Sequence, residues 1–379
     1  MSSNETDFNL LKRIKSHIDH IHPVLPSQIA ITVGRYAFKA LMDSRQFNSG
    51  SSPSMFHILH RKENNLHPYD VVANPDDVMM LDTTFEPHYW FDLHTHLQGS
   101  PEFVGDLKER IFGYHSEVIT VCSISEGVTS GVVPTLNSHL NQQKKDNMYI
   151  AVFPSLDHSS DALFNAFSSL GSLLLQGAGP IVLMDRSHLD SFIGVNRAGG
   201  MLSGEGIARY LSEMILEKKG LIKDLVKLSK SFKVELFSVL MATGSSLEIY
   251  ENLQHILDIT LEQPLMDFDL STAALVYVIV RAPLRLQESL TKGYIELQVN
   301  DWLKGRLNLN IPQICEPIYV DEFNDRIDVV ILVGGFDTRR IFKTIDERIS
   351  RFNRLINEHG FYDKEAWAEI RERLVTEQG

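Results

Sequence analysis

Apolar residues along this chain form short continuous runs, and most runs are followed by a segment in which apolar residues recur every three or four positions. The first run, QIAITVG, ends at Gly34, and a helical pattern follows over 36–42. A second run at 118–123 leads through the small-residue loop Ser125–Gly131 into a helix that we expect from Val132. Similar runs are MYIAVFPS, GPIVLMD and IDVVILVGG. Continuous apolar strands that alternate with helices predict a parallel sheet covered on both faces.

The pattern changes after Asp185. A long amphipathic helix is expected from Gly204 to Lys219, and three strong strands follow it, VELFSVLMATG, TAALVYVIVRAP and DVVILVGGF. Helical patterns also open and close the chain. These changes predict an α/β protein of two domains with five units in all: a helical extension at 1–26, a parallel-sheet domain at 27–203, a central helix at 204–220, a smaller mixed α/β domain at 221–346 and a helical tail at 347–379.

Composition narrows the class of protein. The 379 residues are 43% hydrophobic and 22% charged, which allows a sizeable core and excludes a mainly disordered chain. The net charge of −13 argues against a nucleic-acid partner or an anionic membrane, because phosphate attracts the opposite sign. Two cysteines cannot form a disulfide framework. The sequence shows no apolar signal core and no run long enough to span a membrane, so we expect a cytoplasmic protein.

The loop Ser125–Gly131, with the sequence SEGVTSG, could bind phosphate. It lies between an expected buried strand and a helix N-terminus, where small residues let backbone N–H groups approach an anion that the helix dipole favours. The same composition also suits tight packing between a strand and a helix. Spacing alone leaves both interpretations open.

The string SEGVTSGVVPTLNSHL resembles the glycine-rich loop and following helix of the tubulin/FtsZ superfamily, whose signature is GGGTGSG. Three residues match the signature: Gly127, Ser130 and Gly131. Four depart from it: Ser125, Glu126, Val128 and Thr129. QIAITVGRYAFKAL resembles the family's first strand and first loop; Gly34 matches there, while Ala37 and Phe38 replace a Gly and an Asn.

Other segments resemble the same family in the same order. THLQGSPEFVGDLKERI is similar to the helix before the signature strand, and FPSLDHSSDALFNAFSSLGSLL to the sugar-contacting loop and its helix. GPIVLMDRSHL resembles the strand that ends in a base-contacting pair, with Asp185 kept and Arg186 in place of Asn. GEGIARYLSEMI resembles the central helix, and the strands after it resemble the C-terminal domain of archaeal CetZ-type members. The resemblance covers residues 27 to 350.

This resemblance implies a tubulin/FtsZ-like fold and GTP or GDP as the ligand. It implies a nucleotide site at these positions: Gly34, Arg35, Ser125, Glu126, Gly127, Thr129, Ser130, Gly131, Asp185 and Arg186. The departures predict weak or lost GTP binding, because Glu126 brings a negative charge, Val128 adds bulk and Phe38 removes a polar contact. An active, GTP-hydrolysing polymerising homologue is the alternative.

The resemblance also implies head-to-tail stacking, with itself or with a related tubulin-like subunit, and catalysis shared between subunits. The family's loop after the central helix, Asn-x-Asp-x-x-Asp, enters the next subunit's site. Asp224 aligns with its last acid, while Leu221 and Lys219 replace the other two residues. The segment KKGLIKDLVKLSK carries five lysines, so we expect any association to be salt-sensitive.

A second motif suggests a different enzyme class. WFDLHTHLQGSPE contains His94 and His96 at the end of an apolar run, as in the first barrel strand of the adenosine-deaminase branch of metal amidohydrolases. Two imidazoles on one side of a strand can chelate zinc. A zinc-dependent amidohydrolase is therefore a further alternative, and it requires an eight-stranded barrel.

Overall fold

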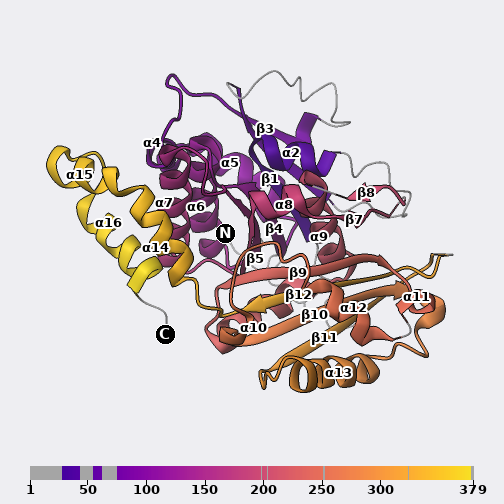
Figure 1. Cartoon of the computed structure of the whole chain (residues 1–379). Helices are drawn as coiled ribbons and strands as arrows, with labels where there is room; N and C mark the ends of the chain where they lie inside the picture. The colour runs from indigo at the N-terminus through magenta and orange to yellow at the C-terminus, as the bar shows by residue number, and fades with distance from the viewer. Residues whose placement is uncertain are drawn as a thin grey trace, which may run out of the picture.

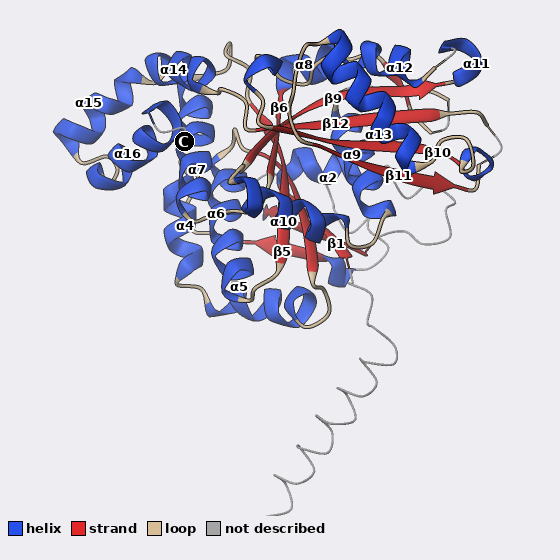
Figure 2. Cartoon of the chain, turned by 90° about the horizontal axis from the view of Figure 1, so that it is seen from below, coloured by secondary structure: helices blue, strands red, loops and turns tan. Residues whose placement is uncertain are grey.

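The computed structural model describes residues 28–42, 54–61, 75–197, 199–202, 204–250, 252–322 and 324–376. Within these ranges a ten-stranded sheet runs through the protein, with helices on both of its faces (Figure 1, Figure 2). The helical extension expected at 1–26 lies outside the described residues. No helix within the described ranges is long and apolar enough to cross a membrane.

The sheet has the strand order β11-β10-β12-β9-β6-β5-β4-β1-β2-β3. Strand β12 is antiparallel to both of its neighbours, and the remaining pairs are parallel. The bounds are β1 (Gln28–Val33), β2 (Ser54–His60), β3 (Val78–Leu81), β4 (Glu117–Ser123), β5 (Asp146–Phe153), β6 (Ile181–Asp185), β9 (Leu236–Ser245), β10 (Leu275–Pro283), β11 (Gln313–Val320) and β12 (Ile327–Gly334). The sheet is open, with β11 and β3 at its edges, and this excludes the barrel that the amidohydrolase alternative requires.

Helices cover the two faces in separate groups. One core cluster joins the sheet to α4, α5, α6 and α7, another joins the opposite face to α2, α9 and α10, and a third places α12 and α13 against the C-terminal strands. The bounds are α2 (Gly34–Met42), α4 (Trp90–Gln98), α5 (Pro101–Leu107), α6 (Gly127–Gln142), α7 (Ser160–Leu175), α8 (Arg186–Ser191), α9 (Glu205–Glu217), α10 (Leu221–Phe232), α11 (Leu247–Tyr250), α12 (Leu253–Thr260), α13 (Lys292–Asp301), α14 (Arg339–Arg348), α15 (Ser350–His359) and α16 (Lys364–Arg371).

Most expected elements are present, with two corrections. The helix expected from Val132 begins five residues earlier, at Gly127, so most of the expected loop is the first turn of α6. His94 and His96 lie on helix α4 rather than on a strand. The predicted boundary between 27–203 and 221–346 stays a prediction, because one sheet continues across it through the short pairing of β6 with β9.

The three C-terminal helices α14, α15 and α16 return to the first half of the chain and lie beside α7 (Figure 1). Their contacts are aromatic: the ring of Phe352 stacks on Phe164 with centroids 4.1 Å apart, and Tyr362 lies 5.0 Å from Phe91 on α4. Large aromatic side chains bury much apolar area each, so this contact fixes the C-terminal helices on the face formed by α4 and α7.

Candidate functional site

The candidate site lies at the carboxyl edge of the parallel strands. Val33 of β1 pairs with Cys122 of β4, and Phe153 of β5 pairs with Asp185 of β6. Strands β1, β4, β5 and β6 therefore end level with one another, and the loops that follow them are neighbours. This brings together the predicted residues at the starts of α2, α6 and α8.

The sheet reverses its order of strands between β1 and β4. After β1 the chain proceeds to β2 and β3 on one side, and it then returns to place β4 on the other side. Helix α2, which follows β1, packs on one face, while α6, which follows β4, packs on the opposite face. In open α/β sheets such a switch point leaves room for a ligand beyond the carboxyl ends of the strands. Gly34 makes the turn from β1 into α2 with a φ of +80°, a conformation that other residues rarely adopt.

The start of α6 supplies backbone donors to this edge. Glu126 is the N-cap residue, and the first helical hydrogen bond runs from Ser130 N to Glu126 O at 2.9 Å. The N–H groups of Gly127, Val128 and Thr129 consequently have no acceptor within the helix. Donors at the start of a sixteen-residue helix suit a single anionic group.

Two of the predicted phosphate residues, Ser130 and Gly131, make contacts with the protein interior. The hydroxyl of buried Ser130 donates to Ile124 O at 2.9 Å. At Gly131 an added Cβ would lie 2.6 Å from Trp90 O, so this glycine permits close packing of α6 on α4. The exposed Glu126 carboxylate makes no capping hydrogen bond to the helix. The backbone N–H groups at the helix start are placed to hold one anionic group, while Ser130 and Gly131 make packing contacts on the inner side of α6.

The polar side chains at the β6–α8 junction bind one another. Asp185 caps α8 by accepting a hydrogen bond from Ser187 N at 2.8 Å, and its carboxylate lies 3.5 Å from His188 Nδ1. Partial burial alone raises the pKa of Asp185, but the hydrogen bonds from His188 and Ser187 lower it overall. The hydrogen bond to Asp185 raises the pKa of His188. The guanidinium of Arg186 lies 4.7 Å above the ring of Tyr36 and so connects α8 to α2. The other predicted arginine, Arg35, directly follows Gly34 and is exposed.

The loop after β5 reaches the same edge. The sequence resemblance identified this segment as similar to a sugar-contacting loop but named no site residue within it. Ser155 Oγ lies 2.8 Å from His158 Nδ1 and also donates to the exposed carboxylate of Asp157. From the C-terminal helices, Arg348 donates to Leu156 O at 2.6 Å. The signal in the sequence was the polar string SLDHS directly after a buried strand.

Asp224 lies at the other end of the sheet. Its helix, α10, begins beneath the amino ends of the strands. Gln28 Nε2, at the start of β1, donates both to the Glu117 carboxylate at the start of β4, at 3.1 Å, and to Lys218 O, just before α10, at 3.2 Å. The seven residues of β4 place this edge about 20 Å from the start of α6. Exposed Asp224 therefore cannot act on the carboxyl edge of its own chain.

The paired histidines do not form a metal site. Residues two apart on a helix point to different sides, so His94 and His96 cannot chelate one ion together. His94 Nδ1 lies 2.7 Å from Thr135 Oγ1, and burial lowers its pKa to about 4. Among the described residues, no group of three or more His, Cys, Asp or Glu side chains could hold a metal ion.

Solved structures identify the fold. CetZ from Methanosaeta thermophila matches with a TM-score of 0.67 at 12% identity over 92% of this chain and 98% of its own. CetZ2 from Haloferax volcanii, in a GTPγS-bound protofilament, matches with a TM-score of 0.62 at 15% identity over 86% of this chain and 99% of its own. An empty FtsZ dimer from M. jannaschii matches with a TM-score of 0.56 at 12% identity over 85% of this chain and 92% of its own. No protein-family model and no curated protein matches the chain. The chain has the tubulin/FtsZ-like fold that its sequence predicted.

Proposed function

We propose that this protein is a divergent tubulin-like cytoskeletal protein that associates head to tail, with a nucleotide site that binds GTP weakly or not at all. The observation that carries the proposal is the separation of the candidate site and Asp224 onto opposite edges of one sheet. Such an arrangement completes the site only when the amino edge of one copy meets the carboxyl edge of the next. A contact of this type does not close, so it produces filaments.

Charge supports this contact. On α10, Lys223, Lys227 and Lys230 are exposed and lie one turn apart along the helix; we call them the lysine stripe. Lys218 is excluded from the stripe because it is half-buried and pairs closely with Glu316. Exposed Lys227, by contrast, lies 4.0 Å from Asp224 on its own helix, at the limit of an ion pair. The carboxyl edge carries exposed acids, among them Glu126, Asp157 and Asp190. The opposite charges of the two edges favour a contact between the amino edge of one copy and the carboxyl edge of the next. They disfavour contacts between two amino edges or between two carboxyl edges.

The inward-facing residues of α6 support weak nucleotide binding. Ser130 and Gly131 serve the packing of α6, and Glu126 places a carboxylate at the helix start, where a phosphate would bind. A carboxylate about 5 Å from a phosphate costs on the order of 1–3 kcal/mol. In the alternative, an active GTPase, the N–H groups of Gly127, Val128 and Thr129 still hold a phosphate, and Asp224 of the next copy orients the attacking water.

Sedimentation tests the proposal. The wild type is spun at low and high salt, with and without GTP, and any nucleotide released from the purified protein is identified by chromatography. We expect assemblies at low salt that do not require GTP. They should dissociate at high salt, because the screening length falls from about 8 Å at physiological ionic strength to about 3 Å at 1 M salt. A monomer under all four conditions would overturn the proposal, and assembly that needs GTP, with steady phosphate release, would favour the active GTPase.

Charge-matched variants locate the contact. Replacing Lys223, Lys227 and Lys230 by Glu reverses the lysine stripe and should leave a monomer at low salt. The control replaces three other exposed lysines by Glu, which gives the same change in net charge: Lys304, Lys343 and Lys364. The control should sediment like the wild type; equal behaviour of the two triple variants would remove α10 from the contact.

A further inference from the structure

A short antiparallel hairpin next to the candidate site exposes apolar side chains. It consists of β7 (Gly194–Val195) and β8 (Met201–Leu202), directly after α8. Ile193 is 71% exposed and Met201 75% exposed, and Val195 between them is also exposed. These three are among only ten large hydrophobic side chains that are exposed in the described residues, and they fall within nine positions. We call them the hairpin patch.

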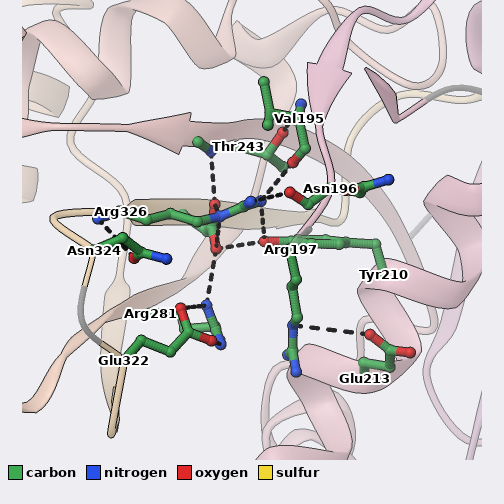
Figure 3. A network of polar contacts seen from close by, with 12 residues as sticks. Val195, Asn196, Arg197, Tyr210, Glu213, Thr243, Arg281, Glu322, Asn324 and Arg326 are labelled. Atoms are coloured by element: carbon green, nitrogen blue, oxygen red, sulfur yellow. Dashed lines mark hydrogen bonds and ion pairs between the residues drawn. The ribbon is translucent and has the colours of Figure 1, made fainter. Parts of the chain in front are cut away.

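The hairpin is held from beneath by a buried network of charges (Figure 3). Arg326, just before β12, donates to the backbone carbonyls of Val195 and Asn196. Its Nε lies 2.9 Å from the carboxylate of Asp328, which is fully buried and also accepts a hydrogen bond from Tyr210 on α9. The network thus connects the hairpin to the central helix and to the C-terminal strands.

Two further residues fix the hairpin. Arg197, within it, reaches down to α9, where its Nη2 lies 2.5 Å from Glu217. Gln263 pairs with the backbone of Ile193 in both directions, accepting from Ile193 N at 2.6 Å and donating to Ile193 O at 3.1 Å. A rigid apolar surface loses little conformational entropy when it is covered, which is what favours a binding surface.

We propose that the hairpin patch is an apolar contact surface of the head-to-tail interface, covered by the amino edge of a second copy of this chain. The proposal rests on the proposed self-association. The hairpin follows α8, whose N-cap Asp185 ends β6 at the carboxyl edge, and it lies on the side of the molecule away from α10 (Figure 1). The lysine stripe and the acids of the carboxyl edge bring the second copy to this side, and the hairpin patch then supplies apolar area, which charges alone do not.

Serine replacements with a matched control test the patch. In the full chain, Ile193→Ser together with Met201→Ser removes two exposed apolar side chains, and we expect the protein concentration for half-assembly at low salt to rise about tenfold or more. Ile249→Ser on α11 is the control, because Ile249 is 73% exposed and lies outside the patch. The control should assemble like the wild type. Equal assembly of the double variant and the wild type would overturn the proposal.

A fluorescent label gives a second measurement that does not depend on the stability of the double variant. Both native cysteines, Cys122 and Cys315, are buried, so Met201→Cys introduces a single reactive thiol. The emission wavelength of an environment-sensitive dye at position 201 should shift as the protein concentration is raised at low salt. The emission of the same dye on Ile249→Cys should not shift. If the wild type assembles and the dye at 201 does not respond, the patch is not in the contact but self-association stands. If the wild type is always a monomer, both proposals fail.

Discussion

Gly127 lies directly against the carbonyl oxygen of Pro87: a Cβ atom added at Gly127 would be 2.4 Å from that oxygen and 2.6 Å from His88 O. The segment that leads into α4 therefore passes over the first turn of α6 with no room for a side chain. One turn later, a Cβ atom added at Gly131 would lie 2.6 Å from the carbonyl oxygen of Trp90. The glycines that match the family signature thus have a packing role that a phosphate site alone would not require.

Gly127→Ala should destabilise the protein. The methyl group must displace backbone atoms rather than the end of a flexible side chain, so we expect a loss of about 1–3 kcal/mol in the free energy of unfolding. Gly105→Ala is the control, because that glycine lies in α5 and has no atom within 4 Å of the added Cβ. It should be neutral or stabilise by up to about 1 kcal/mol. Denaturant midpoints measure both, and a neutral Gly127→Ala would show that the packing is loose.

Glu126→Gln should strengthen the binding of nucleoside triphosphates. The substitution removes a negative charge from the start of α6 and keeps the size of the side chain. If the carboxylate costs on the order of 1–3 kcal/mol, affinity should rise about tenfold or more. Calorimetry with GTP on the wild type, Glu126→Gln and the remote exposed control Glu358→Gln measures this. An unchanged affinity would mean that Glu126 does not face the ligand.

The central strands could be predicted because both of their faces are buried. Strands β1, β4, β5 and β6 read as continuous apolar runs for this reason. Strand β2 was missed because it carries buried polar residues, His57 and His60, and His57 lies 2.7 Å from Thr32 Oγ1 of β1. Strand β11 was missed because Glu316 and Pro317 interrupt its pattern at an edge of the sheet.

The site could be predicted only as far as it follows from the sheet. Parallel strands end at one edge, so the grouping of Gly34, Ser125 and Asp185 was within reach of the sequence. The early start of α6 was not, because the small residues of SEGVTSG are as typical of a loop as of a closely packed first helical turn. The hairpin patch was also out of reach, since the residues that hold it, such as Arg326 and Gln263, come from distant parts of the chain.

His94 should titrate well below its usual range. Burial lowers its pKa to about 4 from 6.5, so between these pH values the unfolded chain binds a proton that the folded protein does not. The free energy of unfolding therefore falls as the pH drops from about 6.5 to about 4. NMR of the histidine ring should show the transition near pH 4. His94→Gln should flatten the pH dependence of stability in this window, and His96→Gln, on the exposed side of α4, should not.

Asp328→Asn should destabilise the protein more than any of the other substitutions proposed above. Arg281 has three carboxylate partners, Glu217, Glu322 and Asp328, whereas the described contacts of Arg326 include Asp328 as its single carboxylate. The substitution leaves the guanidinium of Arg326 buried without an opposite charge. Breaking a buried pair in this way costs about 3–5 kcal/mol.

The same substitution distinguishes a structural from a positional role of the network. Asp325→Asn is the control, because Asp325 pairs with Arg285 at the surface and should change the free energy of unfolding by less than about 1 kcal/mol. Denaturant unfolding gives the energies, and amide hydrogen exchange of the hairpin peptide gives the position. Since Arg326 holds the carbonyls of Val195 and Asn196, exchange in the hairpin should rise more in Asp328→Asn than global unfolding predicts. Exchange that follows global stability alone would mean that the network stabilises the fold without positioning the hairpin.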